Sequence, residues 1–528
     1  MKQLPRGRRL SRKEFLEVVG AGAAGSVALF ATAGCTTGPA EVVGSAQEGA
    51  QAPPSNSKKK SGADIKGATD ALVTFITTAS LRTMPDDVIA VGKRCLIDGF
   101  GVILAGSTVE GSAIVRQYVK AVTDKKEASV LGAERLMVPA PQAALANGAA
   151  GHAMDYDDTQ LSTTPDRTFG LLTHPTVPAL SAALAIAEQK GASGADFLEA
   201  FLTGFEVECK IAEAIDPNHY QRGFHSSGTI GVFGAAACAA KLLKLEPAAV
   251  AHTLTIASGV ASGIRVNFGS MSKPLHVGRA AENGVFAAEL ASRGFTGGAE
   301  GLDGKWGFFQ VFGGGAELDR LVPVLGKPYA IVNPGVSIKP YPCGSLSHPT
   351  MDAMLKLVTD HDVKPEQIKA MRVRAGSNIL DPLRYKTAKT ELEAKFCLPF
   401  LLSSIALRRK AGIREFTDEF VSSEPVQRMM PLVTNVFDAK IEAMGFDKMR
   451  SVVEVDLKDG QTFVQASSDK YHGGPDWPFT RAELHERFTD CATLALPQIR
   501  AQQALAQIEG VDTLKNIREL TRTLTSTT

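Results

Sequence analysis

The sequence predicts a mainly α-helical protein in which a large all-helical domain is interrupted by a smaller α+β domain. Three observations predict it. Apolar residues recur at helical spacing across residues 64–313. Strand-like alternation appears at 371–374 and again in 451–467. The helical pattern then returns from Thr480.

The composition is that of a protein with a large folded core, and the net charge argues against one class of function. The chain has 528 residues, 44% of them apolar and 21% charged, so two or three domains are expected. The net charge of +1 argues against a general nucleic-acid binder. The 50 glycines and few aromatic residues favour helices that pack closely.

The first 35 residues have the features of a secretory signal. A basic stretch precedes the apolar run Val18–Ala33, and small residues precede Cys35. The run from Ser11 to Leu16 resembles a twin-arginine export pattern, and the residues before Cys35 resemble a lipoprotein cleavage site. We therefore expect an exported protein, periplasmic or held at the membrane outside the cytoplasm through a lipid on Cys35. A plain signal peptide cut elsewhere is the alternative.

Residues 36–63 are rich in Gly, Pro, Ser and Lys, which predicts a flexible linker. We expect the helical domain to comprise 64–332 and 475–528, and the α+β domain 333–474. Within the first part, Ser193 to Asp196 begins a helix with a capping pattern. Pro178 and Gly191 mark the start and end of the helix 176–190. Residues 251–263, 280–293 and 230–243 are also predicted helices, rich in small residues.

In the second part, Val453, Val455 and Leu457 alternate with charged residues, and 458–461 supply a turn. Residues 451–467 are therefore a predicted hairpin. Helices are expected again at 481–494 and 499–508.

No sequence motif for a bound cofactor or metal is found. The glycine pattern at 20–25 lies in the leader, without the strand and helix that a dinucleotide site needs. The seven cysteines form no CxxC pair, and the sequence contains no HExxH motif. We therefore expect neither cofactor nor metal.

Residues 151–159 hold one imidazole, three carboxylates and a hydroxyl. On a helix, Asp155 and Thr159 would share a face and form one wall of a polar pocket. His174 follows after a loop. The alternative is a helix end whose carboxylates cap nearby amides.

Two further segments carry candidate groups. His225 stands between glycines just before the predicted helix 230–243, so it could act as acid or base at a carboxylate-binding helix start. Lys273, His276 and Arg279 lie within the glycine-containing segment 265–279. Because Pro274 follows Lys273, we expect this lysine on a loop, where it suits a carboxylate clamp or a proton shuttle.

Lys339 opens the second domain beside two prolines and could reach across the domain boundary to the substrate. The alternative is a rigid hinge with a solvated lysine. Cys343, with His348 nearby, is a weaker candidate nucleophile.

Together these segments resemble the MmgE/PrpD family, which includes 2-methylcitrate dehydratase and cis-aconitate decarboxylase. The resemblance is carried, in order, by residues 151–159, 174–180, 222–237, 267–297, 339–349, 393–400 and 473–488. It implies a helical domain with an inserted α+β lid, a homodimer, and a cofactor-free enzyme acting on a di- or tricarboxylate. The pocket residues that it implies are Asp155, Thr159, His174, His225, Lys273 and Lys339.

The resemblance to the decarboxylase members is incomplete. The stretch from Thr159 to His174 is longer than theirs, and at two positions Phe400 aligns with an active-site tyrosine and Gly344 with a histidine. We therefore expect a lyase that transfers a proton next to a carboxylate, like 2-methylcitrate dehydratase. An isomerase, epimerase or decarboxylase on the same scaffold, or a non-catalytic carboxylate-binding lipoprotein, is the alternative. His225, Lys273, Asp155 and His174 are the expected catalytic residues, with Thr159, Lys339, His276 and Arg279 as substrate-binding residues.

Overall fold

The structure is a computed structural model, and it describes residues 59–122, 124–132, 134–160, 173–445 and 448–525. The predicted signal peptide and Cys35 lie outside these ranges. Described residues of the predicted linker already belong to the folded part, because Lys60 and Ala316 exchange two backbone hydrogen bonds. No helix in the described ranges combines the length and the apolar character needed to cross a membrane.

The described part of the chain is mainly α-helical, as predicted. Before residue 332 its helices are α2 (Ala68–Thr78), α3 (Asp86–Gly106), α4 (Glu110–Val122), α5 (Ala140–Ala153), α6 (Thr176–Lys190), α7 (Gly194–Ile215), α8 (Asn218–Gln221), α9 (Ser226–Thr229), α10 (Gly231–Leu242), α11 (Pro247–Val260), α12 (Ser272–Ala291) and α13 (Phe308–Gly313). The short strands β1 (Ala128–Val130) and β2 (Leu136–Val138) pair antiparallel among them.

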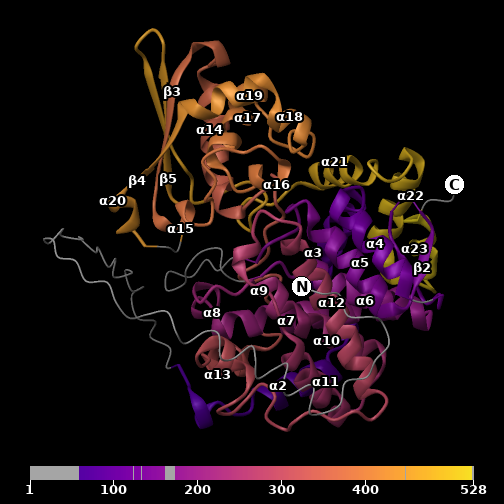
Figure 1. The fold of residues 1–528 in the computed structure, drawn as a ribbon. Helices are drawn as coiled ribbons and strands as arrows, with labels where there is room; N and C mark the ends of the chain where they lie inside the picture. The colour runs from indigo at the N-terminus through magenta and orange to yellow at the C-terminus, as the bar shows by residue number, and fades with distance from the viewer. Residues whose placement is uncertain (1–58, 123, 133, 161–172, 446–447, 526–528) are drawn as a thin grey trace, which may run out of the picture. The chain divides into compact units, whose positions relative to one another are not determined.

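The central helices approach closely because small residues line their contacts. A Cβ on Gly148 of α5 would lie 2.9 Å from the Cα of Gly278 on α12. A Cβ on Gly278 would in turn lie 2.5 Å from the carbonyl oxygen of Leu145. Figure 1 shows these two helices among α3, α6, α7 and α10. Because these glycines have no side chain, the backbones of α5 and α12 can touch. This contact sets the position of α12, which starts at Ser272.

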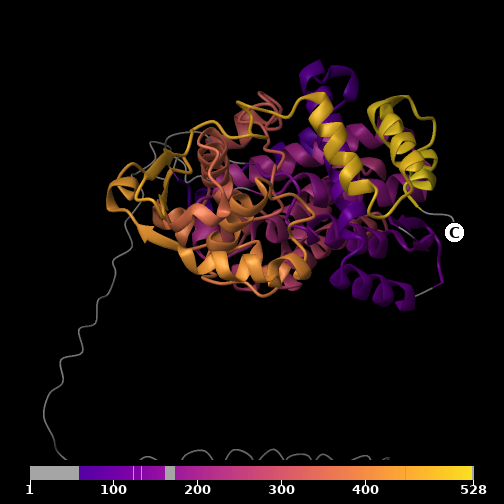
Figure 2. The same ribbon diagram turned by 90° about the horizontal axis from the view of Figure 1, so that it is seen from above.

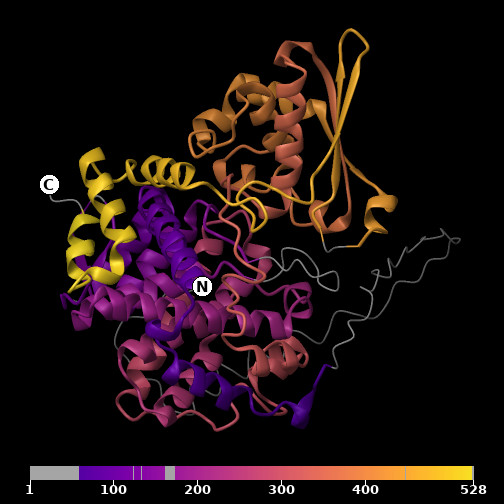
Figure 3. The same ribbon diagram turned by 180° about the vertical axis from the view of Figure 1, so that it is seen from behind.

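Residues 368–466 contain a four-stranded mixed sheet in the order β4-β3-β5-β6. Its strands are β3 (Ile368–Ala375), β4 (Val433–Phe437), β5 (Ser451–Leu457) and β6 (Thr462–Ala466). The predicted hairpin is confirmed, since β5 and β6 pair antiparallel and Val453, Val455 and Leu457 are buried. Figure 3 shows this hairpin at the far edge of the sheet.

Helices accompany the sheet and share a hydrophobic core with it. They are α14 (His348–Asp360), α15 (Ser377–Leu380), α16 (Glu391–Ala394), α17 (Leu398–Arg408), α18 (Asp418–Ser422), α19 (Glu424–Met429) and α20 (Ala439–Glu442). This core gathers buried residues between Tyr341 and Tyr471 and is separate from the cores of the helical part. The elements of the predicted α+β unit are therefore present, while its boundaries at 332/333 and 474/475 stay predictions.

The chain returns to the first helices through α21 (Arg481–Ala492), α22 (Gln498–Glu509) and α23 (Arg518–Thr523). Figure 2 shows α21 and α22 beside α3, and α3 and α21 share buried side chains of one core. Arg487 of α21 donates to Asp98 of α3 at 2.6 Å and to the carbonyl of Tyr156 at 2.6 Å. Its guanidinium also lies 3.5 Å from the centre of the Tyr156 ring.

Replacing Arg487 by Ala should strongly destabilise the protein. The side chains of Arg487 and Asp98 are only 5% and 1% exposed, so the variant leaves a carboxylate buried without its partner. Such a loss costs about 3–5 kcal/mol of unfolding free energy, measured by urea denaturation. Arg481→Ala is the matched control, because Arg481 pairs with Glu509 at the surface and its side chain is 75% exposed. Equal unfolding midpoints for the two variants would contradict this account.

Candidate active site

The segment 154–159 follows the end of α5 and forms a turn. The helix that would place Asp155 and Thr159 on one face is therefore not present. Helix α5 ends at Ala153, and Asp155 has a φ of +50°, in the left-handed region. Few residues other than glycine adopt this region, but aspartate is among those that tolerate it. Asp155 and Thr159 therefore do not share a helix face. The turn sends successive side chains toward different partners.

The Asp155 carboxylate lies between two lysines from distant parts of the chain. Its Oδ1 accepts from Lys273 Nζ at 2.8 Å and from Lys339 Nζ at 2.7 Å. Lys339 Nζ also donates to the carbonyl oxygens of Asp155 and Cys343, each at 3.1 Å. All three charged side chains are buried, which excludes the solvated hinge lysine considered from the sequence. Two positive charges thus share one negative charge.

Lys273 lies in the first turn of α12 and not on a loop, which corrects the prediction. Pro274 fits there because the first turn of a helix does not require its backbone N–H. The Lys273 ammonium is 5.2 Å from the ring centres of both Phe268 and Phe396. Burial lowers the pKa of Lys273, and the Asp155 carboxylate offsets part of this effect.

Burial alone would raise the pKa of Asp155, but the charges of Lys273 and Lys339 overcome it and hold this pKa well below its usual value. The carboxylate is therefore ionised. Its Oδ2 is buried and accepts no hydrogen bond within the described residues. The three charges sum to +1, in surroundings that favour an anionic ligand.

The other carboxylates of the turn have structural partners. Both oxygens of Asp157 lie within 2.9 Å of His152 Nδ1. Asp158 accepts from the backbone N–H of Thr176 at 3.2 Å and from its hydroxyl at 2.6 Å, at the start of α6. Asp158 thus plays the capping role that the sequence left open as an alternative. Burial raises the pKa of both carboxylates.

Two histidines meet at the same site. His174 Nδ1 lies 2.8 Å from the carbonyl oxygen of Asp158 and 3.2 Å from the Thr159 hydroxyl. His225 directly precedes α9, a helix of four residues, and the helix predicted at 230–243 follows as α10. Its ring stacks on His152 with centres 5.4 Å apart. Burial is the main reason why the pKa values of both His174 and His225 fall well below 6.5, so both rings are neutral near pH 7.

These side chains line one pocket. Of the predicted site residues it is lined by Asp155, Thr159, His174, His225, Lys273 and Lys339. His276 and Arg279 are not among the lining residues. His276 lies behind His225 instead, with its Nδ1 3.1 Å from His225 Nδ1. Arg279 is half-exposed and pairs with Glu282 on the same helix.

Sequence reasoning missed several residues of the pocket wall. The hydroxyls of Ser345 and Thr159 share a hydrogen bond of 3.1 Å. The rings of Phe268 and Phe396 cover the Lys273 ammonium. Each lies within or beside a segment that carried a candidate residue, so proximity to those motifs was the available signal. Of the two departures, Gly344 lines the pocket, whereas Phe400 is fully buried in the second core.

One group of described residues has the spacing of a metal site. Ligand atoms of His152, Asp157 and His174 lie within 4.8 Å of one another. His152 Nδ1, both Asp157 oxygens and His174 Nδ1 already take part in hydrogen bonds, and His174 Nδ1 must carry a proton because it faces the Asp158 carbonyl. Their chemistry therefore fits a hydrogen-bonded network better than a ligand set.

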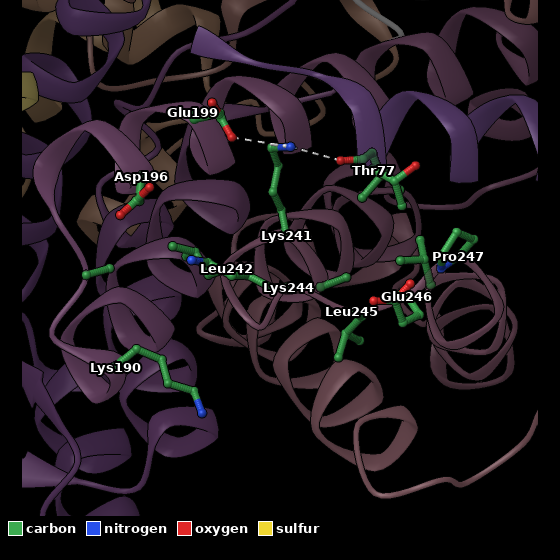
Figure 4. A pocket seen from close by; sticks show the side chains of 14 residues that line it. Thr77, Lys190, Asp196, Glu199, Lys241, Leu242, Lys244, Leu245, Glu246 and Pro247 are labelled. Atoms are coloured by element: carbon green, nitrogen blue, oxygen red, sulfur yellow. Dashed lines mark hydrogen bonds and ion pairs between the residues drawn. The ribbon is translucent and has the colours of Figure 1, made fainter. Parts of the chain in front are cut away.

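A second cavity, of about 590 Å³, lies between α2, α7, α10 and α11. In Figure 4, Lys241 points toward Glu199, and their ion pair measures 3.3 Å. Three lysines and three carboxylates line this cavity, but no histidine does. It thus offers neither an excess of charge nor a group that titrates near neutral pH. The pocket around Asp155 is the better candidate for an active site.

Family models match both parts of the chain. The MmgE/PrpD N-terminal domain matches residues 70–321, and the MmgE/PrpD C-terminal domain matches residues 341–513. The chain belongs to the MmgE/PrpD family.

Three relatives match over nearly their whole lengths. The human cis-aconitate decarboxylase is 26% identical over 471 residues, which cover 87% of this chain and 95% of the relative. The mouse enzyme of the same name is also 26% identical and covered to 94%. A cis-aconitate decarboxylase-like protein of Aspergillus oryzae is 26% identical over 478 residues. Family members act on carboxylates, which agrees with the positive charge of the pocket.

Cys343 should not behave as a nucleophile. Its thiol is fully buried beside Ser347 and Met351, and burial raises its pKa to about 12. The thiolate is the reactive form, so iodoacetamide at pH 8 should not modify Cys343 in the folded protein, as read by mass spectrometry of its peptide. Denatured protein is the control for peptide detection. Rapid modification of native Cys343 would contradict the structure.

Proposed function

We propose that this protein is a lyase that acts on a di- or tricarboxylate by transferring a proton at the carbon next to a carboxylate. One observation carries the proposal: two buried lysines share the Asp155 carboxylate in a pocket that also holds His174 and His225. Its net positive charge suits a polyanionic substrate, and its two neutral histidines suit proton transfer.

The chemistry needs these groups because a carbon next to a carboxylate is a weak acid. Removal of its proton develops negative charge on the carboxylate oxygens. Lys273 and Lys339 are fixed positive charges that can stabilise this charge in a site with little water. Neither lysine must reorganise, since each is already held by Asp155. One histidine would accept the proton and the other would assist at a substrate oxygen.

Among the reactions open to such a site, we propose elimination of water, as in 2-methylcitrate dehydratase. The C–H bond breaks, the carbon–oxygen bond of the neighbouring hydroxyl breaks, and an alkene and water form. Support comes from Gly344, the departure from the decarboxylase pattern that lines the pocket. The second candidate is decarboxylation, which is favoured by the relatives that are named cis-aconitate decarboxylase.

We further propose that the α+β unit acts as a lid. Lys339, Gly344, Ser345, Leu383 and Phe396 line the pocket opposite residues contributed by the helical part. A substrate bound by both parts would join them, and opening would release the product.

Proton NMR in D₂O tests the proposed chemistry. Purified protein is mixed separately with 2-methylcitrate, citrate and cis-aconitate, and the C–H signals next to the carboxylates are followed. Dehydration gives a new alkene signal, whereas decarboxylation gives a product with one carboxylate fewer. Binding without any exchange or turnover would favour a non-catalytic carboxylate-binding protein.

Lys273→Ala should lower the rate in this assay by about 10²–10³ because one charge-stabilising group is lost. The unfolding midpoint should stay close to that of the unchanged protein, since Asp155 keeps Lys339 as a partner. Lys356→Ala is the matched control, because this lysine is exposed and pairs with Asp360 on its own helix. An unchanged rate in folded Lys273→Ala would remove the lysine from the mechanism.

A further inference from the structure

We infer that the two pocket histidines carry their protons on opposite nitrogens, so that His174 presents a basic Nε2 and His225 presents an Nε2–H donor. We also infer that Asn267 and His276 are positioning residues that fix the tautomer of His225. This assignment of roles rests on the proposed function. The tautomers themselves follow from hydrogen bonds.

The proton of His174 is fixed by a backbone carbonyl. His174 Nδ1 lies 2.8 Å from the carbonyl oxygen of Asp158, and a carbonyl can only accept. Nδ1 therefore carries the proton. In the neutral ring this leaves a lone pair on Nε2. Because His174 lines the pocket, that lone pair is the candidate base.

The proton of His225 is fixed by a chain of two residues behind it. Asn267 Nδ2 lies 3.1 Å from His276 Nε2, and an amide nitrogen can only donate. His276 therefore accepts at Nε2 and carries its proton on Nδ1. This Nδ1–H points at His225 Nδ1, 3.1 Å away, which must accept. His225 in turn carries its proton on Nε2.

The surroundings of His225 keep its ring neutral, so this tautomer persists. The ring stacks on His152 at 5.4 Å and lies 5.3 Å from the ring of His276. Burial disfavours an added proton and lowers the pKa of His225, and the positive charge of Lys273 adds to this effect. His225 Nε2 is itself buried and has no hydrogen-bond partner among the described residues. A donor without a partner at a pocket wall is available to a ligand oxygen.

The two tautomers divide the work of proton abstraction. The substrate C–H bond breaks, its electron pair moves into the adjacent carboxylate, and the proton goes to His174 Nε2. The Asp157 carboxylate, 3.7 Å from His174 Nδ1, can stabilise the imidazolium that forms. His225 keeps its proton and donates a hydrogen bond to the oxygen on which charge develops. No further reactant is needed for this step.

Nitrogen-15 NMR of the purified full-length protein, labelled at histidine, tests the tautomers without a substrate. Spectra of His174→Gln and His225→Gln assign the two rings. We expect a protonated, pyrrole-type signal from Nδ1 of His174 and from Nε2 of His225. The other nitrogen of each ring should give a pyridine-type signal. The reverse pattern in either ring would overturn the inference, whether or not the protein turns over a substrate.

A matched pair of substitutions at residue 276 tests the positioning role. In His276→Asn the side-chain amide can still donate to His225 Nδ1. In His276→Asp a carboxylate of the same size can only accept, and Lys273 nearby keeps it ionised. The aspartate should move the His225 proton to Nδ1 and lower kcat by about 10²–10⁴. KM should change little, because residue 276 does not line the pocket.

The asparagine variant should keep the His225 tautomer and lose less than about tenfold in kcat, because a neutral donor still faces His225. Equal losses in the two variants, with the tautomer unchanged in both, would show that His276 has only a packing role. The expected tautomers in a protein that turns over none of the three carboxylates would refute the proposed function and leave the tautomer assignment standing.

Discussion

The shared carboxylate of Asp155 is the constraint on which the rest of the site depends. Lys273 lies in the first turn of α12, and Lys339 lies 66 positions later in the chain, yet both reach the same oxygen. A tight turn after α5, with Asp155 in the left-handed region, presents that oxygen to both. Arg487, His152 and Thr176 hold the neighbouring positions of the turn. The buried ion pair of α3 and α21 is therefore linked to the turn through the Tyr156 carbonyl.

Burying these charges costs free energy, and a packed apolar core would be more stable. We attribute the buried charges to the proposed binding of a carboxylate substrate and not to stability. Among Lys273, Lys339 and Asp155 one positive charge is left uncompensated, which suits the anionic substrate that we propose. The same burial keeps the histidines neutral, so one ring can accept a proton while the other donates a hydrogen bond. Burial thus keeps the histidines neutral, whereas Asp155 stays charged in spite of burial because Lys273 and Lys339 lower its pKa.

Local patterns in the sequence predicted the regular elements well. Periodicity predicted α6 and α7, and alternation predicted the β5–β6 hairpin. The many glycines predicted closely packed helices in general, and the contact of α5 with α12 is one example. Helical spacing failed at Asp155 and Thr159, because the partners that bend this turn lie far away in the sequence. Lys273 was misplaced on a loop, since the residue before a proline is disfavoured in helices but tolerated in a first turn. Arg279 and His276 share a motif with Lys273, but motif membership does not tell which face of α12 meets the pocket.

A double-mutant cycle tests the shared carboxylate most directly. Asp155→Asn leaves two buried ammonium groups without their counter-charge, and we expect it to lower the free energy of unfolding by about 3–5 kcal/mol in urea. Adding Lys273→Met removes one of the two charges, so the double variant should be more stable than Asp155→Asn alone by at least ~1 kcal/mol. Strictly additive losses would show that the two lysines do not depend on this carboxylate, and would contradict the account.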